Sequence, residues 1–115
     1  MKTSLLTIEL AAYGGLIKRM GKDQRVIATH VSLFTALFIQ WQRSDFRSPF
    51  AVTRKELMAY SKIASIATYH KCIRELDEYG YIRYQPSFHP GKGSLIYWPD
   101  NTAQQQNNQA TEQQM

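Results

Sequence analysis

The side chains best suited to bind another molecule lie between residues 65 and 79. Ser65 and Thr68 carry hydroxyls that suit phosphate oxygens, together with the free amides of a helix start. Lys71 and Arg74 carry donors that reach phosphates and base edges. This segment is therefore predicted to be a recognition helix that enters the major groove of double-stranded DNA.

Helical spacing divides this segment into two faces. The apolar residues recur at i, i+3, i+4 and i+7 and are predicted to face a core; they are Tyr69, Cys72, Ile73 and Leu76. The opposite face is small at Ile66 and Ala67 and basic from His70 onward. The acidic residues Glu75, Asp77 and Glu78 follow, so this end of the helix is predicted to point away from DNA.

Further candidate DNA contacts come from three other places in the sequence. Arg54 and Lys55 begin the preceding helix, and Lys62 lies in the turn between the two helices. His89 and Lys92 lie in a glycine-rich loop, where close approach to a DNA backbone is feasible. A solvated basic surface without a ligand is the alternative explanation for all of these residues.

Catalytic and metal chemistry find little support. Cys72 is the only cysteine, which excludes an intramolecular disulfide, and its spacing places it on the core face. His30, His70 and His89 lack the spacing of metal ligands. Paired carboxylates and a phosphate-binding loop are also missing from the sequence, so we expect no enzyme activity, cofactor or metal.

Composition favours a polyanionic partner. The chain has 115 residues, 14 Lys and Arg against 9 Asp and Glu, and a formal net charge of +5. Basic side chains that neutralise phosphates release counterions, which favours nucleic-acid binding. Residues 1–10 do not resemble a signal peptide, and residues 31–41 are too short to span a bilayer. We therefore expect a cytoplasmic protein without a membrane partner.

Two helices are predicted in the first part of the chain. The first covers residues 5–20 and ends at Gly21, and the second covers residues 30–43 with Thr29 as its cap. The first helix has one narrow apolar stripe, formed by Leu6, Leu10, Tyr13, Ile17 and Met20. This stripe either forms a homodimer with a second copy, which we favour slightly, or packs on the core of its own chain.

A helix-turn-helix is predicted next, after a short strand at residues 50–52. Thr53 and Glu56 form a capping box at the start of a helix that runs to Tyr60. Residues 61–64 form the turn, Ser65 caps the second helix, and Gly80 ends it.

The apolar period then changes from 3.6 to 2, which predicts a β-hairpin. Its strands are residues 81–84 and 95–98, joined by a long loop. We expect its aromatic residues to join the core rather than stack on bases; they are Tyr81, Tyr84, Tyr97 and Trp98. Residues 99–115 are rich in Gln and Asn and are expected to be flexible.

The run from Thr53 to Ile82 resembles the winged helix-turn-helix of bacterial regulators. The matching positions are Ser65, Thr68, Ile73, Leu76, Gly80 and Ile82. The chain is also similar to short winged-helix proteins often found near mobile elements, through residues 61–65, 68–72, 80–82 and 93–94. The resemblance covers about residues 28–98. It implies a mainly α fold with a small β-hairpin, in which a winged helix-turn-helix follows an extra N-terminal helix.

The predicted division is an N-terminal helix and loop (1–27), a winged helix-turn-helix (28–98) and a tail (99–115). The predicted function is DNA binding, as a transcriptional regulator with residues 65–79 in the major groove and the wing at 86–94 on the flanking backbone. Two alternatives remain open. One is a winged-helix module that binds protein instead of DNA, and the other is a replication or excision factor of a mobile element.

Overall fold

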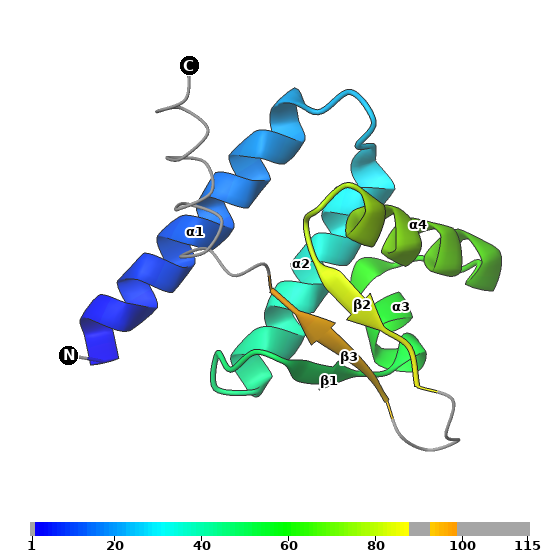
Figure 1. Cartoon of the computed structure of the whole chain (residues 1–115). Helices are drawn as coiled ribbons and strands as arrows, with labels where there is room; N and C mark the ends of the chain where they lie inside the picture. The colour runs from blue at the N-terminus through cyan, green and yellow to red at the C-terminus, as the bar shows by residue number, and fades with distance from the viewer. Residues whose placement is uncertain (1, 88–92, 99–115) are drawn as a thin grey trace.

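The fold is mainly helical with one small antiparallel sheet, as the sequence predicts. The computed structural model describes residues 2–87 and 93–98, with side chains from Thr7 onward. In chain order the elements are α1 (Lys2–Lys22), α2 (Ala28–Arg43), β1 (Phe50–Val52), α3 (Arg54–Ser61), α4 (Ile66–Glu78), β2 (Arg83–Gln85) and β3 (Ser94–Tyr97) (Figure 1). Within the described residues, no helix combines the length and apolar character needed to cross a membrane.

The sheet has the order β1-β3-β2, and both pairings are antiparallel. Phe50 of β1 and Tyr84 of β2 both pair with Ile96, which places β3 in the centre. The predicted hairpin is therefore confirmed, but β2 begins two residues later than expected. Tyr81 and Ile82 precede the strand and are fully buried as part of the hydrophobic core.

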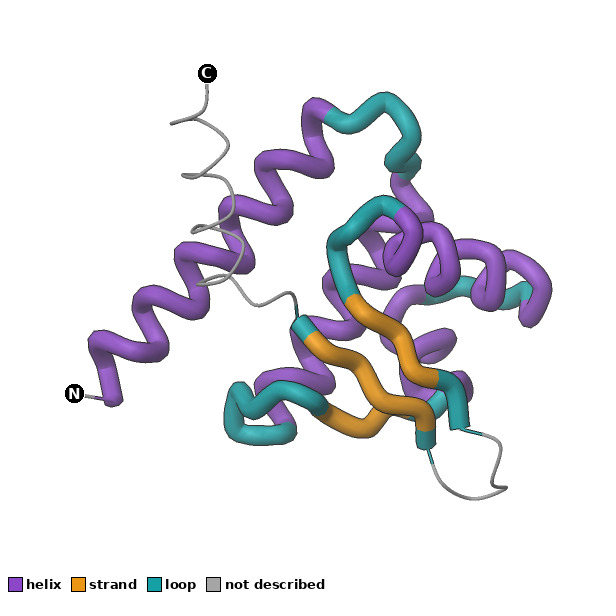
Figure 2. Tube along the Cα trace, viewed as in Figure 1, coloured by secondary structure: helices purple, strands orange, loops and turns teal. Residues whose placement is uncertain are grey.

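The core lies around α2, which packs against α3, α4 and β1 (Figure 2). Leu33, Phe34 and Leu37 of α2 are completely buried. The predicted apolar face of α4 is also buried in full. The inner side of α2 is thus a core surface, whereas Val31 near the start of the helix is 38% exposed.

Among the described side chains of α1, the buried ones lie in the C-terminal half of the helix. Leu16 and Met20 are buried, and the Tyr13 ring stacks on Phe34 at a centroid distance of 5.0 Å. Arg19 lies over the Tyr81 ring at 4.2 Å. Of the predicted stripe, Met20 is buried, Tyr13 and Ile17 are half-buried, and Leu10 is 40% exposed where α1 extends past the core (Figure 1); the side chain of Leu6 lies outside the described residues.

Two of the predicted helix ends need correction. Gly21 lies inside α1, which continues to Lys22. The second helix begins at Ala28, and Ile27 rather than Thr29 occupies the N-cap position. The His30 ring accepts the Ile27 N–H through Nδ1 at 3.0 Å, and this side chain replaces a conventional cap.

The N-terminal ends of α3 and α4 agree better with the sequence. The Thr53 hydroxyl accepts the Glu56 N–H at the start of α3, and the Ser65 hydroxyl accepts the Thr68 N–H at the start of α4. A capping box also requires the Glu56 side chain to accept the Thr53 N–H, and this part of the prediction is wrong. The Glu56 carboxylate instead accepts from the Thr53 hydroxyl and the Arg43 guanidinium.

Candidate nucleic-acid interface

The outer face of α4 presents the predicted contact residues to solvent. Because Ser65 caps the helix and Tyr69, Ile73 and Leu76 anchor its inner side, the side chains on the opposite side point outward. The residues of α4 that were predicted to contact DNA are all exposed; they are Ala67, Thr68, His70, Lys71 and Arg74. The fold therefore leaves this face without a packing partner among the described residues.

Five predicted contact cations on or beside α4 lie outside the ion pairs of the described part of the chain. The ion pairs found there join Arg25 to Asp23, His30 to Glu75 and Arg43 to Glu56. The five cations are all exposed; they are Arg54, Lys55, Lys62, Lys71 and Arg74. Cations without an internal partner are available to phosphates.

A groove of about 470 Å³ joins α4 to the start of α3 and the base of the hairpin. Arg54, Lys55 and His70 line it, opposite hairpin residues that include Tyr84 and Ser94. The structure thus brings together predicted contact residues from α3 and α4 beside the hairpin.

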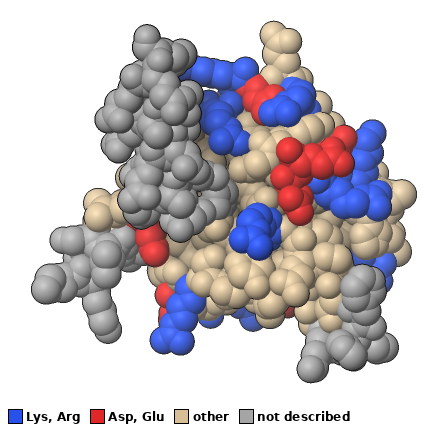
Figure 3. Space-filling model, viewed as in Figure 1, with Lys and Arg blue, Asp and Glu red and all other residues tan. Residues whose placement is uncertain are grey.

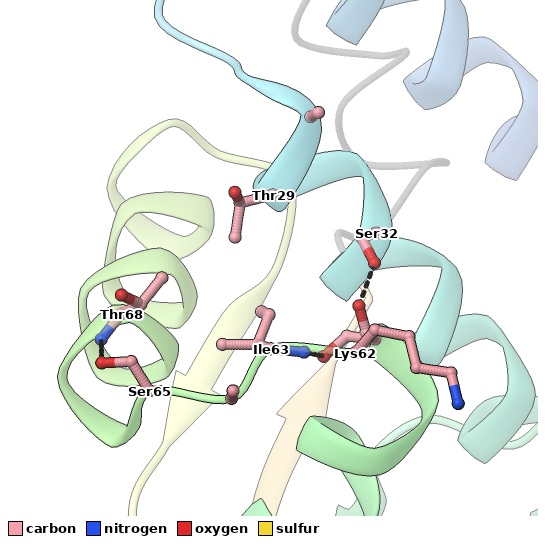
Figure 4. Close-up of a pocket in the computed structure, with 9 residues that line it drawn as sticks. Thr29, Ser32, Lys62, Ile63, Ser65 and Thr68 are labelled. Atoms are coloured by element: carbon pink, nitrogen blue, oxygen red, sulfur yellow. Dashed lines mark hydrogen bonds between the residues drawn. The ribbon is translucent and has the colours of Figure 1, made fainter.

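A second groove, of about 440 Å³, lies at the turn between α3 and α4 (Figure 4). Ser65 and Thr68 line one side, and Thr29 and Ser32 of α2 line the other. Thr29 and Ser32 were not predicted as binding residues, because the sequence of this helix indicated only a role in the core. Lys62 adopts a left-handed conformation with φ of 65° at the end of α3. Its ammonium extends away from Ser65 and Thr68, so it does not converge with them.

The acidic residues of α4 are mostly used inside the fold. The Glu75 carboxylate accepts from His30 at 2.9 Å, and the Asp77 carboxylate accepts the Tyr84 N–H at 3.1 Å. Glu78 is exposed. On the face seen in Figure 3, acidic side chains still lie beside basic ones over α4, so the surface of this helix is mixed in charge.

His30, Cys72 and Glu75 come together between α2 and α4, with potential metal-ligating atoms within 4.8 Å of one another. The sequence did not reveal this cluster, because His30 lies on α2, far along the chain from Cys72 and Glu75 on α4. Since Nδ1 of His30 accepts the Ile27 N–H, the proton of the neutral ring is on Nε2, which donates to Glu75. Burial also raises the pKa of the Cys72 thiol. These bonds favour a structural role over metal ligation.

The predicted aromatic residues divide between core and sheet surface. Tyr81 is completely buried, and Trp98 packs edge-on to Phe34 and Trp41. Tyr84 and Tyr97 are half-buried on the sheet. His89 and Lys92, together with the tail from residue 99, lie outside the described residues.

Comparison with protein families, characterised proteins and solved structures finds no match to this chain. The geometry of the site therefore carries the functional interpretation.

Proposed function

We propose that this chain is a DNA-binding protein of the winged helix-turn-helix type, acting as a transcriptional regulator. In this proposal α4 enters the major groove and the β2–β3 hairpin lies along the flanking backbone. The element order from α2 to β3, with β3 central in the sheet, supports a winged helix. A replication or excision factor would use the same contact with DNA.

The observation that carries the proposal is the outward face of α4. It begins with Ile66 and the small residue Ala67 and continues with His70, Lys71 and Arg74, all exposed and outside the ion pairs of the described residues. A major-groove helix needs little bulk at its start and donors further along. Arg54 and Lys55 extend the basic surface to the hairpin.

Selection of binding sites from random duplexes by the full-length protein tests the proposal. We expect enriched sequences, and an affinity that falls steeply with salt. If Arg54, Lys55, Lys71 and Arg74 each neutralise one phosphate, the slope of log K against log salt is about −4. No enrichment at low salt, or an affinity that does not depend on salt, would contradict DNA binding.

Self-association through the N-terminal half of α1 is part of the same proposal. Ile8 is 63% exposed and Leu10 is 40% exposed on a helix that extends past the core. A second copy covering these side chains would place two α4 helices on a two-fold symmetric site. Sedimentation velocity tests this, because Leu10→Lys should shift a dimer to monomer, and a wild type that stays monomeric contradicts it.

The second candidate function is a protein-binding module. The mixed charge over α4 favours it, because acidic side chains repel a DNA backbone. The salt dependence and the random-duplex selection separate the two candidates.

A further inference from the structure

Ile66 is the one large hydrophobic side chain of α4 that the fold leaves exposed. It is the first residue of the helix, directly after the Ser65 cap, and it is 50% exposed. Within α4, which is described in full, no other large hydrophobic side chain is this exposed.

Ile66 was expected on the outward face of this helix, and it lies there beside the buried face, three residues before Tyr69 and seven before Ile73. The helix begins at the edge of the molecule, where α4 projects from the other elements (Figure 1). Ile66 therefore keeps apolar surface in water at the end of α4 that the proposed function places in the major groove.

The major groove offers one apolar group on its base edges, which is the C5-methyl of thymine. Aliphatic side chains recognise this group by excluding water from both partners. His70 follows Ile66 by one turn and Arg74 by two, so the apolar contact would lie at one end of a row of donors.

We propose that Ile66 contacts a thymine methyl and makes the site specific for thymine at that position. This inference rests on the proposed function, since it requires α4 in the major groove. It adds a specificity determinant that depends on neither charge nor hydrogen bonding.

Replacement of thymine by deoxyuridine tests the contact, because it removes only the methyl. Duplexes enriched from a random pool by the full-length protein are resynthesised with deoxyuridine at one thymine at a time. Loss of one methyl contact should weaken wild-type binding about fourfold at one position in the half-site. Ile66→Ala should lose a similar factor on the thymine duplex and respond no further to deoxyuridine.

Ile27→Ala is the matched control, because Ile27 is also an exposed isoleucine, 58% exposed, but lies before α2 and outside the proposed DNA and dimer contacts. It should leave both affinities unchanged. If the wild type binds thymine and deoxyuridine duplexes equally at every position, this inference is wrong while DNA binding stands. If the wild type enriches no duplex, both the inference and the proposed function are wrong.

Discussion

The imidazole of His30 on α2 donates from Nε2 to a carboxylate oxygen of Glu75 on α4, at a distance of 2.9 Å. The ring is only 2% exposed, and its Nδ1 accepts the Ile27 N–H. The His30 side chain thus caps the start of α2 and also joins α2 to α4, the proposed recognition helix. The bond also lowers the pKa of the Glu75 carboxyl and turns this acidic group away from the outer face of α4.

His30→Leu should lower the free energy of unfolding by about 2 kcal/mol. The substitution keeps much of the volume but leaves the Ile27 N–H without its acceptor and Glu75 without its donor. Urea denaturation measures the change. Glu75→Gln keeps an acceptor for Nε2 and should cost less than half as much. Equal stability of His30→Leu and the wild type would show that these bonds contribute nothing.

Removal of single charges from the outer face of α4 should weaken DNA binding without unfolding the protein. Lys71→Ala and Arg74→Ala should each reduce the affinity several-fold and make the salt slope less steep by about 1. Their thermal stability should stay within about 0.5 kcal/mol of the wild type, because both side chains are exposed. Lys18→Ala removes the same charge from an exposed position on α1 and is the control. If all three variants bind alike in gel shifts, α4 does not contact DNA.

Gly93→Ala should disrupt the sheet. A Cβ at this position would lie 2.4 Å from the Val52 carbonyl oxygen, so β1 or the hairpin must move. We expect a loss of about 1–3 kcal/mol in urea denaturation. Gly15→Ala is the matched control, because an added Cβ there meets no atom within 4 Å. It should stabilise α1 by about 1 kcal/mol. A neutral Gly93→Ala would contradict the close packing of the two segments.

Ionisation of Asp23 should make the free energy of unfolding depend on pH in the acidic range. Its carboxylate accepts from the Arg25 guanidinium at 2.9 and 2.8 Å and from the Tyr81 hydroxyl at 2.9 Å. The Arg25 hydrogen bonds hold the pKa of this carboxyl well below its ordinary value of 3.8. Because this pKa is lower in the folded state, the ionised carboxyl stabilises the fold at pH values above 3.8. This stabilisation is lost as the pH falls toward the folded-state pKa.

The Asp23→Asn variant isolates this effect, because it cannot ionise. It should be less stable than the wild type at neutral pH, and the difference should shrink as the pH falls below 3.8. Asp45→Asn changes an exposed carboxylate outside the ion pairs of the described residues and should leave the pH profile unchanged. A constant difference between wild type and Asp23→Asn would contradict the assignment.

Local signals determined much of this protein from the sequence alone. The Thr53 and Ser65 hydroxyls, the spacing of Tyr69 and Leu76, and Gly80 with its φ of +86° each depend on neighbouring residues. Caps, helical periodicity and a left-handed glycine act within one or two turns, so their effect is visible in a short stretch of sequence. The outward direction of Lys71 and Arg74 follows from the same periodicity.

Contacts between distant segments were decided only by the tertiary structure. The position of β3 between β1 and β2, and the hydrogen bond between His30 of α2 and Glu75 of α4, join residues far apart in the chain. The predicted stripe of α1 includes Leu10 and not Leu16, yet Leu10 is exposed and Leu16 is buried. The position at which α1 leaves the core decides this difference. Local patterns specify which residues share a face, but the partner of that face depends on how the elements pack together.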